Sequence, residues 1–134
     1  MTTTTARPRT SRMTVARIAV ATVSALVANL IVFAIGTAAD VTFDVESPQP
    51  ISAVTVALFT VIPLVLGAVV VALVSRRWSG FQHFAAWAGL AFALLTIAGS
   101  FGAAGDTTTA LTLAAMHLVV GAAWFLGVRP RENA

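Results

Sequence analysis

Residues 18–39 read IAVATVSALVANLIVFAIGTAA, a stretch of 22 residues without a charge between Arg17 and Asp40. At about 1.5 Å per residue, a helix of this length spans roughly 30 Å, which is the thickness of the hydrocarbon core of a bilayer. A run this long and this apolar is typical of a transmembrane helix. The sequence therefore predicts that the chain crosses a membrane here.

The rest of the chain repeats this pattern. It has 134 residues, of which 58% are hydrophobic and 10% charged, whereas soluble domains carry about 25% charged residues. So short a chain cannot bury that much apolar surface within itself. We expect four spans, at about 15–39, 51–75, 84–102 and 107–128. The short connections between them predict an all-α, up-down-up-down four-helix transmembrane bundle.

The arginines predict how the bundle is oriented. They precede span one, follow span two and follow span four, so an even number of spans places them all on one side: Arg7, Arg9, Arg12, Arg17, Arg76, Arg77, Arg129 and Arg131. Short loops rich in Arg stay in the cytoplasm. We therefore expect a plasma-membrane protein with both termini cytoplasmic, comprising a disordered tail at 1–12, a membrane domain at 13–128 and a tail at 129–134.

One alternative concerns the first span. A basic N-terminal segment, an apolar run and the small residues GTAAD at 36–40 also occur in cleaved signal peptides. The apolar run is longer than the 7–15 residues usual in such peptides. Cleavage near Ala38 would leave three spans.

Two spans carry a polar residue near the bilayer midplane. Asn29 and His117 each lie close to the middle of a run of 22 uncharged residues. Burying either group without a hydrogen-bond partner would be costly, so both are expected to face the bundle interior. Small residues share their helical faces and would let another helix approach: Thr22, Ala25 and Gly36 with Asn29, and Ala110, Ala114 and Gly121 with His117. We expect His117 to lie within reach of span one with Asn29 as its first-choice partner; a different rotation of the helices would bring in Thr60 or the carbonyl of Phe59 instead.

Span two adds two residues at the same depth. The ring of Pro63 removes the backbone hydrogen bond to the carbonyl of Phe59, which predicts a bend there. Thr60 is the nearest hydroxyl to that freed carbonyl. The sequence thus predicts a midplane polar layer of Asn29, Thr60, Pro63 and His117.

Two roles remain open for this layer. It can join helices structurally, which suits a small interaction or accessory membrane component. Alternatively, it can serve a minimal transporter or proton-linked channel through His117. A dry core around His117 would favour the first role, and a water-accessible cavity reaching it would favour the second.

Other functions are disfavoured by composition. The chain has no cysteine, no paired carboxylates and no cluster of metal ligands, so we expect no enzyme activity, no cofactor and no metal site. Its basic residues are too sparse to follow a nucleic-acid backbone. The expected partners are the lipid bilayer and, through the small-residue faces, a second copy or another membrane protein.

Three segments carry a family resemblance: VANLIVFAIG at 27–36, LFTVIPLVLGA at 58–68 and MHLVVGAAW at 116–124. Together they resemble an uncharacterised family of four-span membrane proteins from high-GC bacteria, a domain of unknown function. The resemblance covers roughly residues 13–128. It implies a multi-pass membrane protein and assigns no substrate, cofactor or mechanism.

Overall fold

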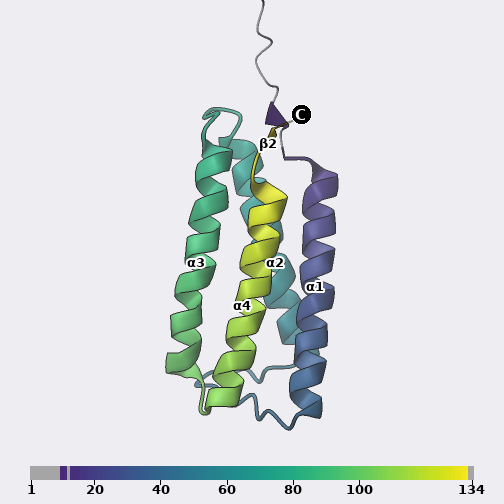
Figure 1. Ribbon diagram of the computed structural model, residues 1–134, viewed down its shortest axis with the longest axis vertical. Coiled ribbons are helices and arrows are strands. Elements are labelled where there is room, and N and C mark those ends of the chain that lie inside the picture. Colours follow the sequence, from purple (N-terminus) through teal and green to yellow (C-terminus); the bar gives the residue numbers. More distant parts are fainter. Residues whose placement is uncertain (1–9, 12, 133–134) are drawn as a thin grey trace, which may run out of the picture.

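The computed structural model describes residues 10–11 and 13–132, and this part of the chain folds into four long helices and a small two-stranded ribbon (Figure 1). The helices alternate in direction and stand side by side: α1 (Val15–Ala38), α2 (Ala53–Val74), α3 (Phe81–Ala103) and α4 (Thr107–Val128). Each one is long and apolar enough to cross a membrane. The expected all-α four-helix architecture is therefore confirmed.

Side-chain caps fix where three of the helices begin. Thr14, Ser52 and Asp106 adopt extended backbone conformations, and their side-chain oxygens accept a backbone N–H from the first turns of α1, α2 and α4. Such a cap satisfies an amide that has no partner within the helix. The helix α3 begins after Gly80 without a side-chain cap, three residues before its expected start.

The surface of the bundle is apolar. Leu95, Phe59 and Phe92 expose 72%, 70% and 68% of their area, whereas the core is built largely from small residues such as Ala25, Ala86 and Ala110. An apolar surface around a core of small residues is what a lipid solvent favours, because large side chains gain nothing by leaving lipid. The distribution supports a bilayer environment.

The buried face of α1 consists of the residues that the sequence predicted. Thr22, Ala25, Asn29 and Gly36 are its buried residues. On α4, Ala110, Ala114 and Gly121 are buried as well. These small residues allow close approach: a Cβ added at Gly121 would lie 2.8 Å from the Cβ of Ala93 on α3.

The helices do not all pack on one another equally. The helix α1 packs along both α2 and α4, and α3 packs along α4, but α2 makes few contacts with α3 or α4. The bundle is therefore a row of packed pairs, α2–α1–α4–α3, and the helices at the two ends of the row, α2 and α3, make few contacts with each other. This open side creates the site described below.

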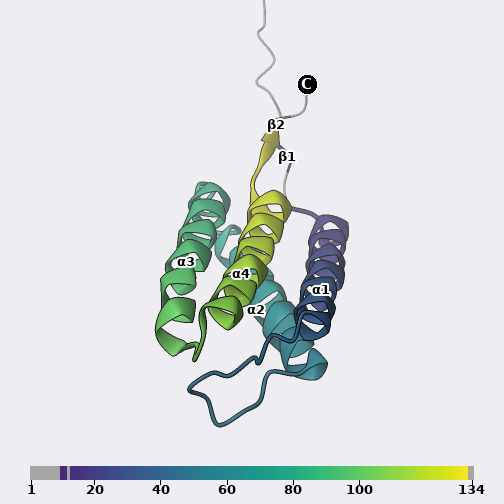
Figure 2. The same ribbon diagram turned by 60° about the horizontal axis from the view of Figure 1, so that its bottom comes forward.

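The two termini lie together at one end of the bundle. The strand β1 (Thr10–Ser11) pairs antiparallel with β2 (Arg131–Glu132) (Figure 2). The expectation of a disordered tail at 1–12 is wrong for Thr10 and Ser11, because they hydrogen-bond to the segment after α4. The other residues of that tail, 1–9 and 12, lie outside the described residues, as do 133–134.

The opposite end is tied together by the loop between α1 and α2. Asp106 accepts hydrogen bonds from the hydroxyls of Thr42 (2.6 Å), Thr109 (2.7 Å) and Thr108, and from the Thr109 amide at 2.8 Å. The hydroxyl bonds, that from Thr108 foremost, hold the pKa of Asp106 well below its usual range. Backbone bonds from Gly105 to Asp44 and from Glu46 to Ala103 attach the same loop to the α3–α4 turn.

Candidate binding cavity

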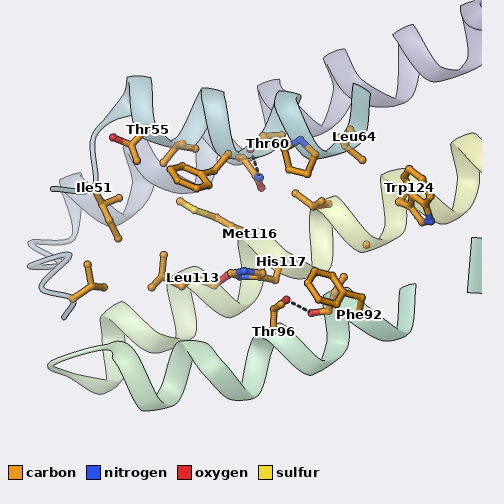
Figure 3. Close-up of a pocket in the computed structure, with 18 of the residues that line it drawn as sticks. Ile51, Thr55, Thr60, Leu64, Phe92, Thr96, Leu113, Met116, His117 and Trp124 are labelled. Atoms are coloured by element: carbon orange, nitrogen blue, oxygen red, sulfur yellow. Dashed lines mark hydrogen bonds between the residues drawn. The ribbon is translucent and has the colours of Figure 1, made fainter. Parts of the chain in front are cut away.

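A cavity of about 880 Å³ opens where α2 separates from α3 (Figure 3). Its walls come from α2 and α3, α4 lines its interior, and the loop before α2 forms one end. Most of its lining is aliphatic or aromatic. Among the described residues that line it, none carries a formal charge.

Trp124 closes the cavity toward the end that holds the termini. Its indole Nε1 donates a hydrogen bond to the carbonyl oxygen of Ala85 on α3 at 2.8 Å. Glycines on both neighbouring helices make room for the ring: a Cβ at Gly67 of α2 would lie 2.6 Å from it, and one at Gly89 of α3 would lie 2.0 Å from Nε1. Trp124 therefore contacts both α2 and α3 at this end of the cavity.

The other end of the cavity is more polar. Ser47, Gln49 and Thr55 line it, beside the loop between α1 and α2. Phe59 and Phe92 also line the cavity while remaining largely exposed, so they flank its opening between α2 and α3. A molecule can thus reach the interior from the loop end or sideways from surrounding lipid.

Asn29 and Thr60 form a buried pair in the wall. The Nδ2 of Asn29 donates to the Oγ1 of Thr60 at 2.9 Å, and both residues are 2% exposed. The Oδ1 of Asn29 is buried and accepts no hydrogen bond from the described chain. This bond joins α1 to α2 at the depth that the sequence indicated.

His117 lies on another side of the cavity. Its Nδ1 is 2.8 Å from the carbonyl oxygen of Leu113 on its own helix, and 3.5 Å from the Oγ of Ser100 on α3. The expected contact with Asn29 is wrong: Asn29 bonds Thr60, and His117 turns toward α3. Depth along a helix follows from residue number, but its rotation follows from packing, and α4 packs closely on both α1 and α3.

The four predicted residues therefore border one cavity without forming one network. Asn29, Thr60, Pro63 and His117 all line it. The helix α2 continues through Pro63, which is inside it; the bend at that position stays a prediction. The sequence analysis did not predict the roles of Trp124, Gly67 and Gly89. The only sequence signal for these roles was that small residues occur on two spans and an aromatic residue on a third.

The polar atoms also define the hydrogen-bonding character of the site. Because a carbonyl oxygen only accepts, the Nδ1 of His117 carries the proton in its bond to Leu113, and in the neutral imidazole Nε2 is then the acceptor. Thr96 donates its hydroxyl to the carbonyl of Ala93 at 2.7 Å. The cavity is thus an apolar chamber with a few hydrogen-bond acceptors midway along it.

Comparison with known proteins identifies a family but no activity. The chain belongs to DUF6069, a family of unknown function, whose model matches residues 8–134. No curated protein and no solved structure matches the chain.

Proposed function

We propose that this protein is a non-enzymatic accessory component of the plasma membrane, and that it works by holding a small guest molecule in the cavity between α2 and α3. The observation that carries this proposal is the cavity itself, which leaves an otherwise packed bundle open along one side. Its volume of about 880 Å³ falls within the range of roughly 300–1,000 Å³ usual for small-molecule sites.

A small guest fits this opening better than a partner helix does. Trp124 connects α2 to α3 through its bond to Ala85 and its contact with Gly67, so a helix could not lie in the opening along its whole length. The largely aliphatic lining and the aromatic rings at the opening favour a hydrophobic guest.

Transport is the competing function. A cavity that reaches His117 is the feature that the sequence analysis associated with a transporter or proton-linked channel. A continuous path would require Trp124 to leave its position between Gly67 and Gly89. We therefore favour binding over passage.

The test compares two single substitutions that introduce the same ring at different places on α4. Val120→Phe places a ring in the cavity, whereas Leu118→Phe places the same ring on the exposed side of α4. A molecule that binds only the folded protein raises its thermal unfolding midpoint. Lipid extract added to the purified protein in detergent should raise the midpoint by several degrees for the wild type and Leu118→Phe, but not for Val120→Phe.

Two results would count against the proposal. Equal shifts in all three proteins would place the bound lipid outside the cavity. A pH-dependent flux into proteoliposomes that Val120→Phe abolishes and Leu118→Phe preserves would establish transport instead.

A further inference from the structure

The middle of the cavity offers free hydrogen-bond acceptors. The proton on Nδ1 of His117 is used by Leu113, and the hydroxyl protons of Thr96 and Ser100 are used by the carbonyls of Ala93 and Thr96. His117 is only partly buried, and its Nε2 makes no hydrogen bond within the described chain. A guest that meets Nε2 must therefore bring a donor.

Asn29 adds a second free acceptor. One amide N–H of Asn29 donates to Thr60, and its Oδ1 is buried without a donor from the described chain. A buried acceptor without a donor is costly, and in lipid no bulk water is at hand to supply one. The donors that remain among the described lining residues at this depth are the second amide N–H of Asn29 and the hydroxyl of Thr60, whose oxygen accepts from Asn29.

We propose that the guest is a neutral hydrophobic molecule with a hydroxyl group, which donates to the Nε2 of His117 and directs its apolar part toward Trp124. This inference rests on the proposed function and specifies the ligand of the same site. A hydroxyl both donates and accepts, so it also matches the Thr60 donor. A ketone or an ether only accepts and leaves His117 without a partner.

The absence of charge around the site argues for a neutral guest. An ammonium group could also donate to His117, but the described lining residues include no carboxylate to balance it. Burying an unpaired ion in an apolar chamber costs much more than burying a hydroxyl with a partner. A carboxylate would find neither a cation nor a sufficient set of donors.

The part of the cavity between His117 and Trp124 accommodates the apolar part of the guest molecule. His117 and Trp124 are seven residues apart on α4, which is about 10 Å along the helix. Leu64, Phe92 and Val120 are among the apolar residues that line the cavity with them. This portion suits a short aliphatic chain or one end of a longer lipid.

The experiment uses Trp124 as the reporter. Trp78→Phe and Trp87→Phe leave it as the only tryptophan in the full chain, reconstituted into phosphatidylcholine liposomes. The probes are an octanol with bromine on its terminal carbon, which quenches tryptophan on contact, and the methyl ether of the same molecule. We expect the alcohol to reach half-maximal quenching at about one-fifth of the ether's membrane concentration, the factor expected for one hydrogen bond.

Substitution of His117 then tests whether this residue causes the preference for the alcohol over the ether. In His117→Leu the alcohol and the ether should quench equally, whereas His83→Leu, which changes the histidine outside the cavity lining, should retain the fivefold difference. Equal quenching by both probes in the parent protein would overturn the hydroxyl proposal while leaving a binding cavity. Quenching by neither probe above that of a lipid-exposed indole would contradict the proposed function itself. The first comparison needs no substitution at His117, so it stands even if that variant does not fold.

Discussion

At the scale of single residues, two glycines determine the shape of the site. Gly67 and Gly89 have no side chain, and the ring of Trp124 occupies the space that a Cβ would fill. This lets one aromatic residue of α4 contact both α2 and α3. The position of Trp124, which closes one end of the cavity, thus depends on the lack of a side chain at these two glycines.

Gly89→Ala should therefore destabilise the protein by about 1–3 kcal/mol, because the added methyl group displaces Trp124 and breaks its bond to Ala85. Gly99→Ala is the matched control on the same helix, since nothing lies within 4 Å of its added Cβ. It should be neutral or stabilise by up to about 1 kcal/mol through the better helix propensity of alanine. Unfolding in detergent, followed by circular dichroism, measures both changes. Equal effects of the two substitutions would mean that Trp124 does not need the space at Gly89.

The polar residues show how far sequence reasoning reaches at this scale. Residue numbers placed Asn29, Thr60 and His117 at similar depth, and all three line one cavity. Their partners could not be predicted, because a rotation of one helix by a fraction of a turn changes which neighbour a side chain meets. His117 bonds within its own helix to Leu113, a partner that needs no tertiary contact at all.

At the scale of helices, the existence of the four elements and most of their ends followed from the sequence, but the start of α3 and the neighbours of each helix did not. Uncharged runs bounded by arginines or carboxylates mark the helices, and Thr14, Ser52 and Asp106 cap three of them. Large apolar residues occur around all four helices, so the pattern does not indicate which faces meet. The separation of α2 from α3 is therefore a property that only the structure reveals.

The carboxylate of Asp106 connects the start of α4 to the loop between α1 and α2. The stability of the fold is therefore predicted to depend on pH. The pKa of Asp106 is lowered in the folded state, so its ionised form stabilises the fold above the ordinary value of about 3.9. That contribution is lost as the pH falls below about 4 toward the lowered folded-state pKa. Asp106→Asn keeps a capping side chain but removes the charge.

The wild type should therefore be more stable than Asp106→Asn at pH 7, and the difference should shrink once the pH drops below about 4. Thermal unfolding at a series of pH values measures it. Asp40→Asn is the control, since it removes a carboxylate from the same end of the bundle without touching the hydrogen bonds of Asp106. A difference that stays constant from pH 7 to pH 3 would show that the charge of Asp106 does not stabilise the fold.

At the scale of the whole molecule, α1 is an integral part of the bundle. It packs along α2 and α4, and α2 has few contacts with α3 or α4 to replace it. Removing α1 by signal-peptide cleavage would leave α2 attached mainly by its loops. The packing therefore favours a retained first span over the cleaved alternative.

The distribution of charge over the two ends of the bundle leads to the last prediction. Arg76 and Arg77 follow α2 at the end that holds the paired termini, while Asp40, Asp44 and Asp106 lie at the other end. By the positive-inside rule we predict that the arginine end is cytoplasmic. Because the natural chain has no cysteine, a single introduced cysteine reports its own position without interference.

Gln49→Cys and Ser79→Cys place exposed thiols at opposite ends of the bundle. In intact cells a membrane-impermeant maleimide should label Gln49→Cys, and it should label Ser79→Cys only after the membrane is permeabilised. The cysteine-free wild type controls for background labelling. The reverse pattern would invert the orientation and place the loop end of the cavity in the cytoplasm. Helices of 22 residues are long enough to place the two ends of the bundle on opposite sides of a membrane. Labelling of both thiols in intact cells would therefore contradict the four-span arrangement.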